Sequence, residues 1–141
     1  MLSRSVGCAI IPVERGVFMY NRKITDVERI FYIAVLDELL LCLSSVGADD
    51  DFSPDALNQN TLAICSAKVK LENRNFSFNA QEVKVIYWAI SDFCDDLSNM
   101  PQGDKCFVSG EDCINPLDVR SGWRSLLKRS KTGRDILDLF D

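Results

Sequence analysis

The segment "IFYIAVLDELLLCL", Ile30 to Leu43, decides the fold because it is hydrophobic around the whole circumference of a helix. Only Asp37 and Glu38 interrupt it. The run is too short to cross roughly 30 Å of hydrocarbon, and two central carboxylates would be costly there. We therefore predict the central helix of a bundle, covered by neighbours on several sides or paired with a second copy. Both carboxylates should lie at its rim or beside basic partners.

The flanking residues show where this helix begins and where the next one starts. Thr25 supplies an N-cap oxygen and Glu28 a carboxylate three residues later, which is a capping box. The helix is expected over 26–44. An acidic segment follows, and then Ser53 and Pro54 have the order of an N-cap hydroxyl before a proline at the first helical position.

Residues 61–78 fit two patterns. Read as a helix, five positions share one face: Leu57, Thr61, Ile64, Ala67 and Leu71. The segment "AKVKLE" (67–72) also alternates with period two and could pair as a strand with "FSF" (76–78). The alanines and the lack of glycine between these segments favour the helix. A fold with a small β-hairpin near 66–78 stays open as the alternative.

The second helix that matters is "EVKVIYWAISDFCDDL", Glu82 to Leu97, capped by Asn79. At 100° per residue, one face holds Val83, Ile86, Ile90, Phe93, Cys94 and Leu97. Trp88 lies on the opposite side, among Lys84, Ser91, Asp92 and Asp95. A tryptophan there predicts that this side is also covered. The cover is either the C-terminal helices, through Trp123 or Phe140, or a partner.

The C-terminal third begins with an irregular segment. Residues 100–116 ("MPQGDKCFVSGEDCINP") contain two prolines and two glycines and are expected to form a long loop. Two helices should follow, one from Leu117 to about Lys131 and a short one from residue 133 or 134 to Phe140, capped by Thr132. The predicted fold is all-α, with about five helices around the apolar 26–44 helix.

Domain organisation follows from length. A chain of 141 residues, 47% hydrophobic, is long enough for one globular domain. We assign it to residues 19–141. Residues 1–18 are interpreted as an N-terminal extension, either disordered or preceding a true translation start at Met19, because "ERG" (14–16) can be encoded by a purine-rich run.

The residue types narrow the chemistry. The chain has no histidine, which removes the commonest general base and zinc ligand. No nucleophile elbow or phosphate-binding glycine loop occurs, so we predict a protein without enzymatic activity or cofactor. The cysteines are irregularly spaced and no signal peptide precedes them, which favours a reducing, cytoplasmic setting with Cys42, Cys65 and Cys94 as small buried hydrophobic groups.

Two groups of residues have side chains of the kind that bind metal ions. Cys94, Cys106 and Cys113, with Asp104 or Asp112, could surround a zinc ion, but their spacing matches no paired-cysteine motif. Free thiols, or a redox-labile pair of Cys106 with Cys113, are expected instead. The acidic run near residue 50 lacks the alternating ligands of a calcium loop and is interpreted as a solvated linker. No metal is predicted.

Charge is unevenly distributed. The chain carries 16 basic and 21 acidic residues, a net charge of −5. Four basic residues recur at helical spacing and form a stripe: Arg120, Arg124, Lys128 and Lys131. Such a stripe could follow phosphates, which defines an alternative function as a small nucleic-acid-binding regulator, with a dimer formed through the central helix as one form of it. The acidic balance favours a stripe that neutralises the protein's own carboxylates or faces a protein.

These features predict a non-enzymatic protein–protein interaction module. In size and charge the chain resembles phage-encoded inhibitors of bacterial defence, including anti-CRISPR proteins, and immunity proteins. The resemblance implies a small acidic inhibitor or decoy that blocks a surface of another protein, such as the basic groove of a nucleic-acid-binding effector, away from membranes. A homodimer is also considered. The predicted partner-binding residues are Trp88, Val85, Asp92, Asp95, Asp49, Asp50 and Asp51.

Overall fold

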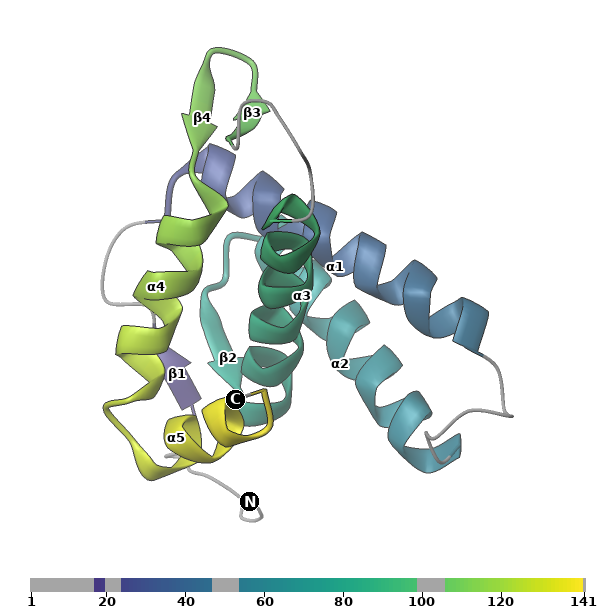
Figure 1. Ribbon diagram of the computed structural model, residues 1–141. Helices are drawn as coiled ribbons and strands as arrows, with labels where there is room; N and C mark the ends of the chain where they lie inside the picture. The colour runs from purple at the N-terminus through teal and green to yellow at the C-terminus, as the bar shows by residue number, and fades with distance from the viewer. Residues whose placement is uncertain (1–16, 20–23, 47–53, 99–105, 141) are drawn as a thin grey trace.

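The fold is mostly helical, as the sequence predicts. The computed structural model describes residues 17–19, 24–46, 54–98 and 106–140 (Figure 1). Within them the helices are α1 (Asp26–Val46), α2 (Pro54–Glu72), α3 (Ala80–Ser98), α4 (Pro116–Leu127) and α5 (Lys131–Asp138). Two antiparallel strand pairs join them: β1 (Val17–Met19) with β2 (Ser77–Asn79), and β3 (Phe107–Ser109) with β4 (Asp112–Ile114).

Helix α3 contacts all four other helices. It lies between the α1–α2 pair on one side and α4 on the other, with α5 packed near its first turns (Figure 1). Helix α1 packs against α2, α3 and both strands of the hairpin at the top of the molecule. The predicted apolar face of α3 is buried at Val83, Ile86 and Ile90, and Val85 and Tyr87 are buried as well. More than one side of α3 is therefore covered, as the position of Trp88 predicts.

The start of α1 and its two carboxylates match the sequence. The Glu28 amide donates to Thr25 Oγ1 at 3.3 Å, which confirms Thr25 as the cap. Asp37 and Glu38 are exposed at the rim, and Asp37 forms an ion pair with Lys68 of α2. The hydrogen bond to Asp37 raises the pKa of Lys68. Asp37 therefore has the predicted basic partner, and Glu38 has the predicted position at the rim.

Residues 66–72 are helical, so the hairpin proposed near 66–78 is wrong. Helix α2 ends because Arg74 adopts a left-handed conformation (φ 57°). The Asn75 amide then donates to Lys70 O at 2.8 Å and the Arg74 amide to Leu71 O at 3.1 Å, the two bonds of a Schellman motif. The following segment does form a strand, but it pairs with residues 17–19, Phe78 opposite Phe18.

This pairing reaches into the predicted N-terminal extension. Strand β1 includes Val17 and Phe18 as well as Met19, so the predicted boundary before residue 19 falls inside a strand. Residues 1–16 lie outside the described residues. The division of the chain at Met19 stays a prediction.

The segment predicted as a long loop contains a β-hairpin. Residues 99–105 lie outside the described residues, but β3 and β4 pair in register from Phe107 with Ile114 to Ser109 with Asp112. The connection is Gly110-Glu111, with φ +63° at Gly110 and not at Glu111, as in a type II′ turn. Glycine takes this conformation without steric penalty, which is why the chain reverses there.

The boundary between the last two helices lies earlier in the chain than the sequence suggests. Helix α4 ends at Leu127 rather than at Lys131, and α5 begins at Lys131. The cap of α5 is Ser130 and not Thr132, because Ser130 Oγ accepts from the Gly133 amide at 3.0 Å. The serine, two residues earlier than predicted, therefore sets the start of α5.

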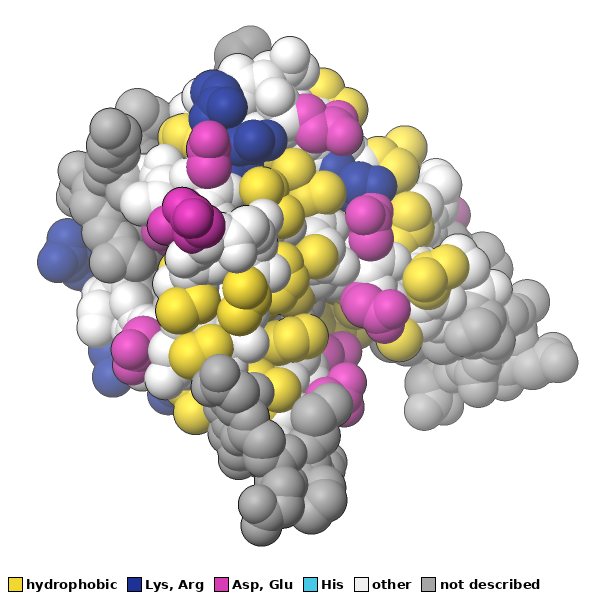
Figure 2. Space-filling view, turned by 90° about the horizontal axis from the view of Figure 1, so that it is seen from above, with side chains coloured by type: hydrophobic (Ala, Val, Ile, Leu, Met, Phe, Trp, Pro, Cys, Tyr) yellow, Lys and Arg dark blue, Asp and Glu magenta, His cyan; other side chains and the backbone are white. Residues whose placement is uncertain are grey.

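The surface carries hydrophobic side chains among charges. Seen from the hairpin end, they gather in the middle of the face, with acidic and basic side chains around them (Figure 2).

Cys42 and Cys65 are exposed, which corrects the expectation that they are buried, whereas Cys94 is buried. Within the described residues, no helix combines the length and the hydropathy needed to span a membrane.

Candidate functional site

A pocket of about 360 Å³ opens where α3, α4 and the end of α5 meet. Figure 1 shows these three helices converging on one side of the molecule. Most of the lining comes from one face of α3, since positions 88, 91, 92 and 95 follow helical spacing. The lining residues are Tyr87, Trp88, Ser91, Asp92, Asp95, Arg120, Arg124, Leu139 and Phe140.

Aromatic rings form one wall of the pocket. Phe140, just after α5, lies against Trp88 with ring centroids 6.3 Å apart, and against Tyr87 at 5.6 Å. Phe140 thus provides the cover that was predicted for Trp88. Trp123, the other predicted candidate, is fully buried in the core. Trp88 remains half-buried, so part of the indole is accessible.

Two arginines of α4 close the opposite wall. Arg120 and Arg124 are four residues apart and therefore point to the same side of α4, toward α3. Arg120 Nη1 lies 3.4 Å from Asp95 Oδ1, and Arg124 Nη1 donates to the Tyr87 hydroxyl at 2.9 Å. Half of the predicted basic stripe thus contacts the protein's own α3.

Asp92 lies at the exposed rim of the pocket, where its surroundings disfavour a negative charge. Its pKa is raised, first by partial burial of the carboxylate and then by the neighbouring carboxylates of Asp95 and Asp96. A hydrogen bond with Trp88 acts in the opposite direction. The three aspartates stand within one turn of α3, so their charges repel one another along the edge of the pocket.

The predicted site residues divide into three groups. Trp88, Asp92 and Asp95 line the pocket together with Arg120 and Arg124, so two sets expected to serve alternative functions share one site. Lys128 and Lys131 are exposed outside it, and Lys131 pairs with Asp135 at 3.1 Å. The acidic cluster of residues 49–51 lies outside the described residues.

Val85 requires a correction. Its side chain is fully buried and belongs to the core, so it is not available to a partner. In its place the pocket has Tyr87 and Ser91, which are not among the predicted site residues. Ser91 follows Trp88 by three positions and precedes Asp95 by four, so helical spacing from Trp88 is the signal that could have found it.

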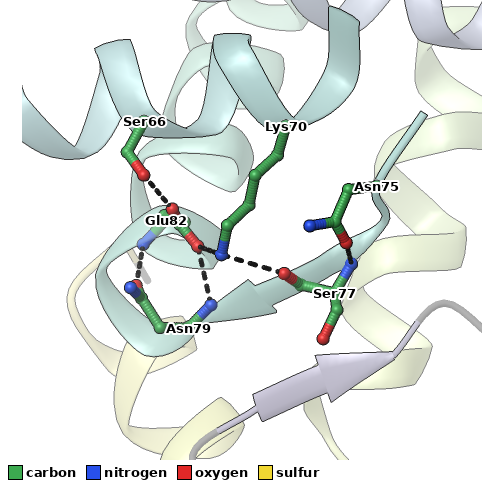
Figure 3. Close-up of polar contacts among 6 residues, drawn as sticks. All are labelled: Ser66, Lys70, Asn75, Ser77, Asn79 and Glu82. Atoms are coloured by element: carbon green, nitrogen blue, oxygen red, sulfur yellow. Dashed lines mark hydrogen bonds and ion pairs between the residues drawn. The ribbon is translucent and has the colours of Figure 1, made fainter. Parts of the chain in front are cut away.

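A second polar cluster has a structural role (Figure 3). The fully buried Glu82 accepts from the Asn79 amide at 2.9 Å, while the Glu82 amide donates to Asn79 Oδ1 at 2.8 Å. This is the predicted capping box, complete in both directions. Lys70 Nζ lies 2.7 Å from Glu82 Oε1 and 3.0 Å from Ser77 O, and Ser66 donates to Glu82 Oε2. These contacts join α2, β2 and α3.

The residues proposed for a zinc site do not form one in the described part of the chain. No group of three or more cysteine or acidic side chains there is arranged to hold a metal ion. Cys106 and Cys113 are exposed thiols on and beside the hairpin, and Asp104 lies outside the described residues.

Comparisons with known proteins gave no relative: no protein-family model, curated protein or solved structure matches this chain. Function is therefore inferred from the pocket.

Proposed function

We propose that this protein is a non-enzymatic binding protein that acts by occupying a surface of another protein with the face formed by α3, α4 and α5. The observation that carries the proposal is the pocket, which combines a half-buried tryptophan with carboxylates and guanidinium groups. Tryptophan, tyrosine and arginine are enriched among the interface residues that contribute most to binding. The pocket contains all three.

The charged side chains around the pocket are already held in place. Arg120 contacts Asp95 and Arg124 contacts the Tyr87 hydroxyl, so neither guanidinium has to be ordered from a fully mobile state on binding. Side chains fixed before binding lose less conformational entropy. This arrangement supports a role in recognition.

The proposed mode of action is inhibition by blocking a partner's surface, in the cytoplasm. The net charge of −5 favours approach to a basic surface, such as that of a nucleic-acid-binding effector, to which Asp49, Asp50 and Asp51 would add charge. The irregular spacing of the cysteines supports a reducing compartment.

The nucleic-acid alternative has weaker support. Binding along the basic stripe would use all four cations, but Arg120 and Arg124 contact α3. Only Lys128 and Lys131 are exposed on the outer part of the stripe. Phosphate binding would therefore have to break existing contacts.

Site-specific photo-crosslinking tests the proposal. A photoreactive phenylalanine analogue replaces either Leu139, at the pocket, or Leu62, on α2, whose side chains are 66% and 62% exposed. In lysate of cells that naturally carry the gene, position 139 should give a discrete protein adduct that Trp88→Ala removes, whereas position 62 should not. Identical adducts at both positions, or none at 139, would contradict the proposal. Micromolar binding of random duplex DNA, lost in Arg124→Ala/Lys128→Ala, would support the alternative instead.

A further inference from the structure

We propose that the pocket receives a basic side chain of the partner, an arginine guanidinium, between the indole of Trp88 and the carboxylates of Asp92 and Asp95. This inference deepens the proposed function and rests on it. It assigns the chemistry of the group that the pocket recognises, which neither the sequence nor the fold alone indicates.

The positions of the two pocket arginines leave the centre of the site to α3. Asp95 and Tyr87, which hold Arg120 and Arg124, are eight residues apart, or about 12 Å along the helix. Trp88, Ser91 and Asp92 lie between them on the same face of α3. Arg120 and Arg124 thus contact α3 at the two ends of the pocket. Between them, α3 presents the indole of Trp88 beside the carboxylate of Asp92.

Carboxylates outnumber guanidinium groups around the pocket by one. Asp92, Asp95 and Asp96 follow one another along about one turn of α3, whereas α4 contributes Arg120 and Arg124, of which Arg120 lies 3.4 Å from Asp95. The groups facing Asp92 are the carboxylates of Asp95 and Asp96 on its own helix, the arginines of α4 and the apolar end of α5. The influences that raise the pKa of Asp92 are burial and carboxylates. An added cation would relieve this repulsion.

The aromatic wall selects the kind of cation. Phe140 packs against Trp88 at an interplanar angle of 41°, while the half-buried indole keeps accessible surface toward the pocket. A guanidinium group is planar and weakly hydrated, so it stacks on an indole and donates to a carboxylate at the same time. Lysine can supply the charge but not the planar contact. The volume of about 360 Å³ is small among ligand pockets and suits one side chain.

The probes for the test are small arginine analogues titrated against the ¹⁵N-labelled protein. They are N-acetyl-arginine-N-methylamide, the uncharged isostere N-acetyl-citrulline-N-methylamide, and N-acetyl-glutamate-N-methylamide as the anion. The Trp88 indole resonance, assigned with Trp88→Phe, should shift saturably with the arginine probe at a Kd on the order of 1 mM. The citrulline probe should bind at least about fivefold more weakly, since it lacks the charge. The resonance of the buried Trp123 is the internal reference.

Matched variants locate the interaction. Asp92→Asn should weaken binding of the arginine probe by about fivefold, because it removes one charge-assisted hydrogen bond. Asp112→Asn, at an exposed hairpin position, should leave it unchanged. Binding should also weaken as the pH falls and Asp92 is protonated. Equal binding of citrulline, stronger binding of the glutamate probe, or full affinity in Asp92→Asn would overturn the inference.

The crosslinking experiment and the arginine-probe titration test the two proposals separately. If the arginine probe does not bind while the crosslink from position 139 persists, the protein-binding function stands and the basic-side-chain inference falls. If the probe binds but no adduct forms at position 139, the pocket is a site for small cations and the proposed protein-binding function falls.

Discussion

At the scale of single residues, Gly133 is the position where one methyl group should matter most. A Cβ there would lie 2.1 Å from Leu127 O and 2.7 Å from Leu127 C, both backbone atoms that cannot move independently. The close approach of α5 to the end of α4 therefore requires glycine. Gly133→Ala should lower the free energy of unfolding by about 2 kcal/mol through overpacking, although alanine is normally the better helix former.

Urea denaturation of Gly133→Ala and of the neighbouring Thr132→Ala checks this. Thr132 is not the cap of α5, so its variant should stay within about 0.5 kcal/mol of the wild type. A Gly133→Ala protein as stable as Thr132→Ala would mean that the corner between α4 and α5 relaxes freely.

At the scale of elements, a buried hydrogen-bonded chain links α1 to α4. Trp123 Nε1 donates to the Tyr32 hydroxyl at 2.9 Å, and that hydroxyl donates to Glu28. All three side chains are buried. Tyr32→Phe keeps the packing and removes both hydrogen bonds, so it should lower the free energy of unfolding by about 2 kcal/mol.

Tyr87→Phe is the matched control, since the Tyr87 hydroxyl accepts one hydrogen bond from the partly exposed Arg124. It should lower the free energy of unfolding by less than about 1 kcal/mol. Urea midpoints at an unchanged m-value measure both effects. A larger loss of stability in Tyr87→Phe than in Tyr32→Phe would show that the hydrogen bonds between α1 and α4 contribute less than the one between Tyr87 and Arg124.

The elements that could be predicted are those whose signals are local. Thr25 and Asn79 mark the starts of α1 and α3 because each caps its helix through its own side chain. The end of α2 was not readable, because Arg74 takes a left-handed conformation that sequence statistics reserve for glycine. Strand β2 depends on residues 17–19 for its partner, a contact that no local pattern encodes.

At the scale of the whole molecule, the candidate site could be predicted only in pieces. Periodicity placed Trp88, Asp92 and Asp95 on one face of α3 and the arginines on one face of α4. It could not show that these faces meet, since the packing of two helices is decided by the tertiary fold. For the same reason periodicity could not show that Val85, which it puts near Trp88, is covered by neighbouring elements and fully buried.

The whole-molecule prediction concerns a conflict between stability and binding at Asp92. Its pKa in the folded state lies above the ordinary 3.8, so the ionised form is disfavoured by folding. Below pH 3.8 both states are protonated and the penalty is absent; as the pH rises through the folded pKa, the penalty becomes complete. Asp92→Asn should therefore be more stable than the wild type at pH 7, with the difference vanishing near pH 3.

Asp26→Asn provides the opposite case. The hydrogen bond and charge of Arg74 lower the pKa of Asp26, so ionised Asp26 favours the folded state and its removal should reduce stability at pH 7. Thermal or urea unfolding of both variants between pH 3 and pH 7 measures the two trends. If Asp92→Asn were no more stable than the wild type at neutral pH, Asp92 would not be a strained charge. A gain in stability coupled to weaker arginine binding would show a carboxylate retained for recognition at the expense of the fold.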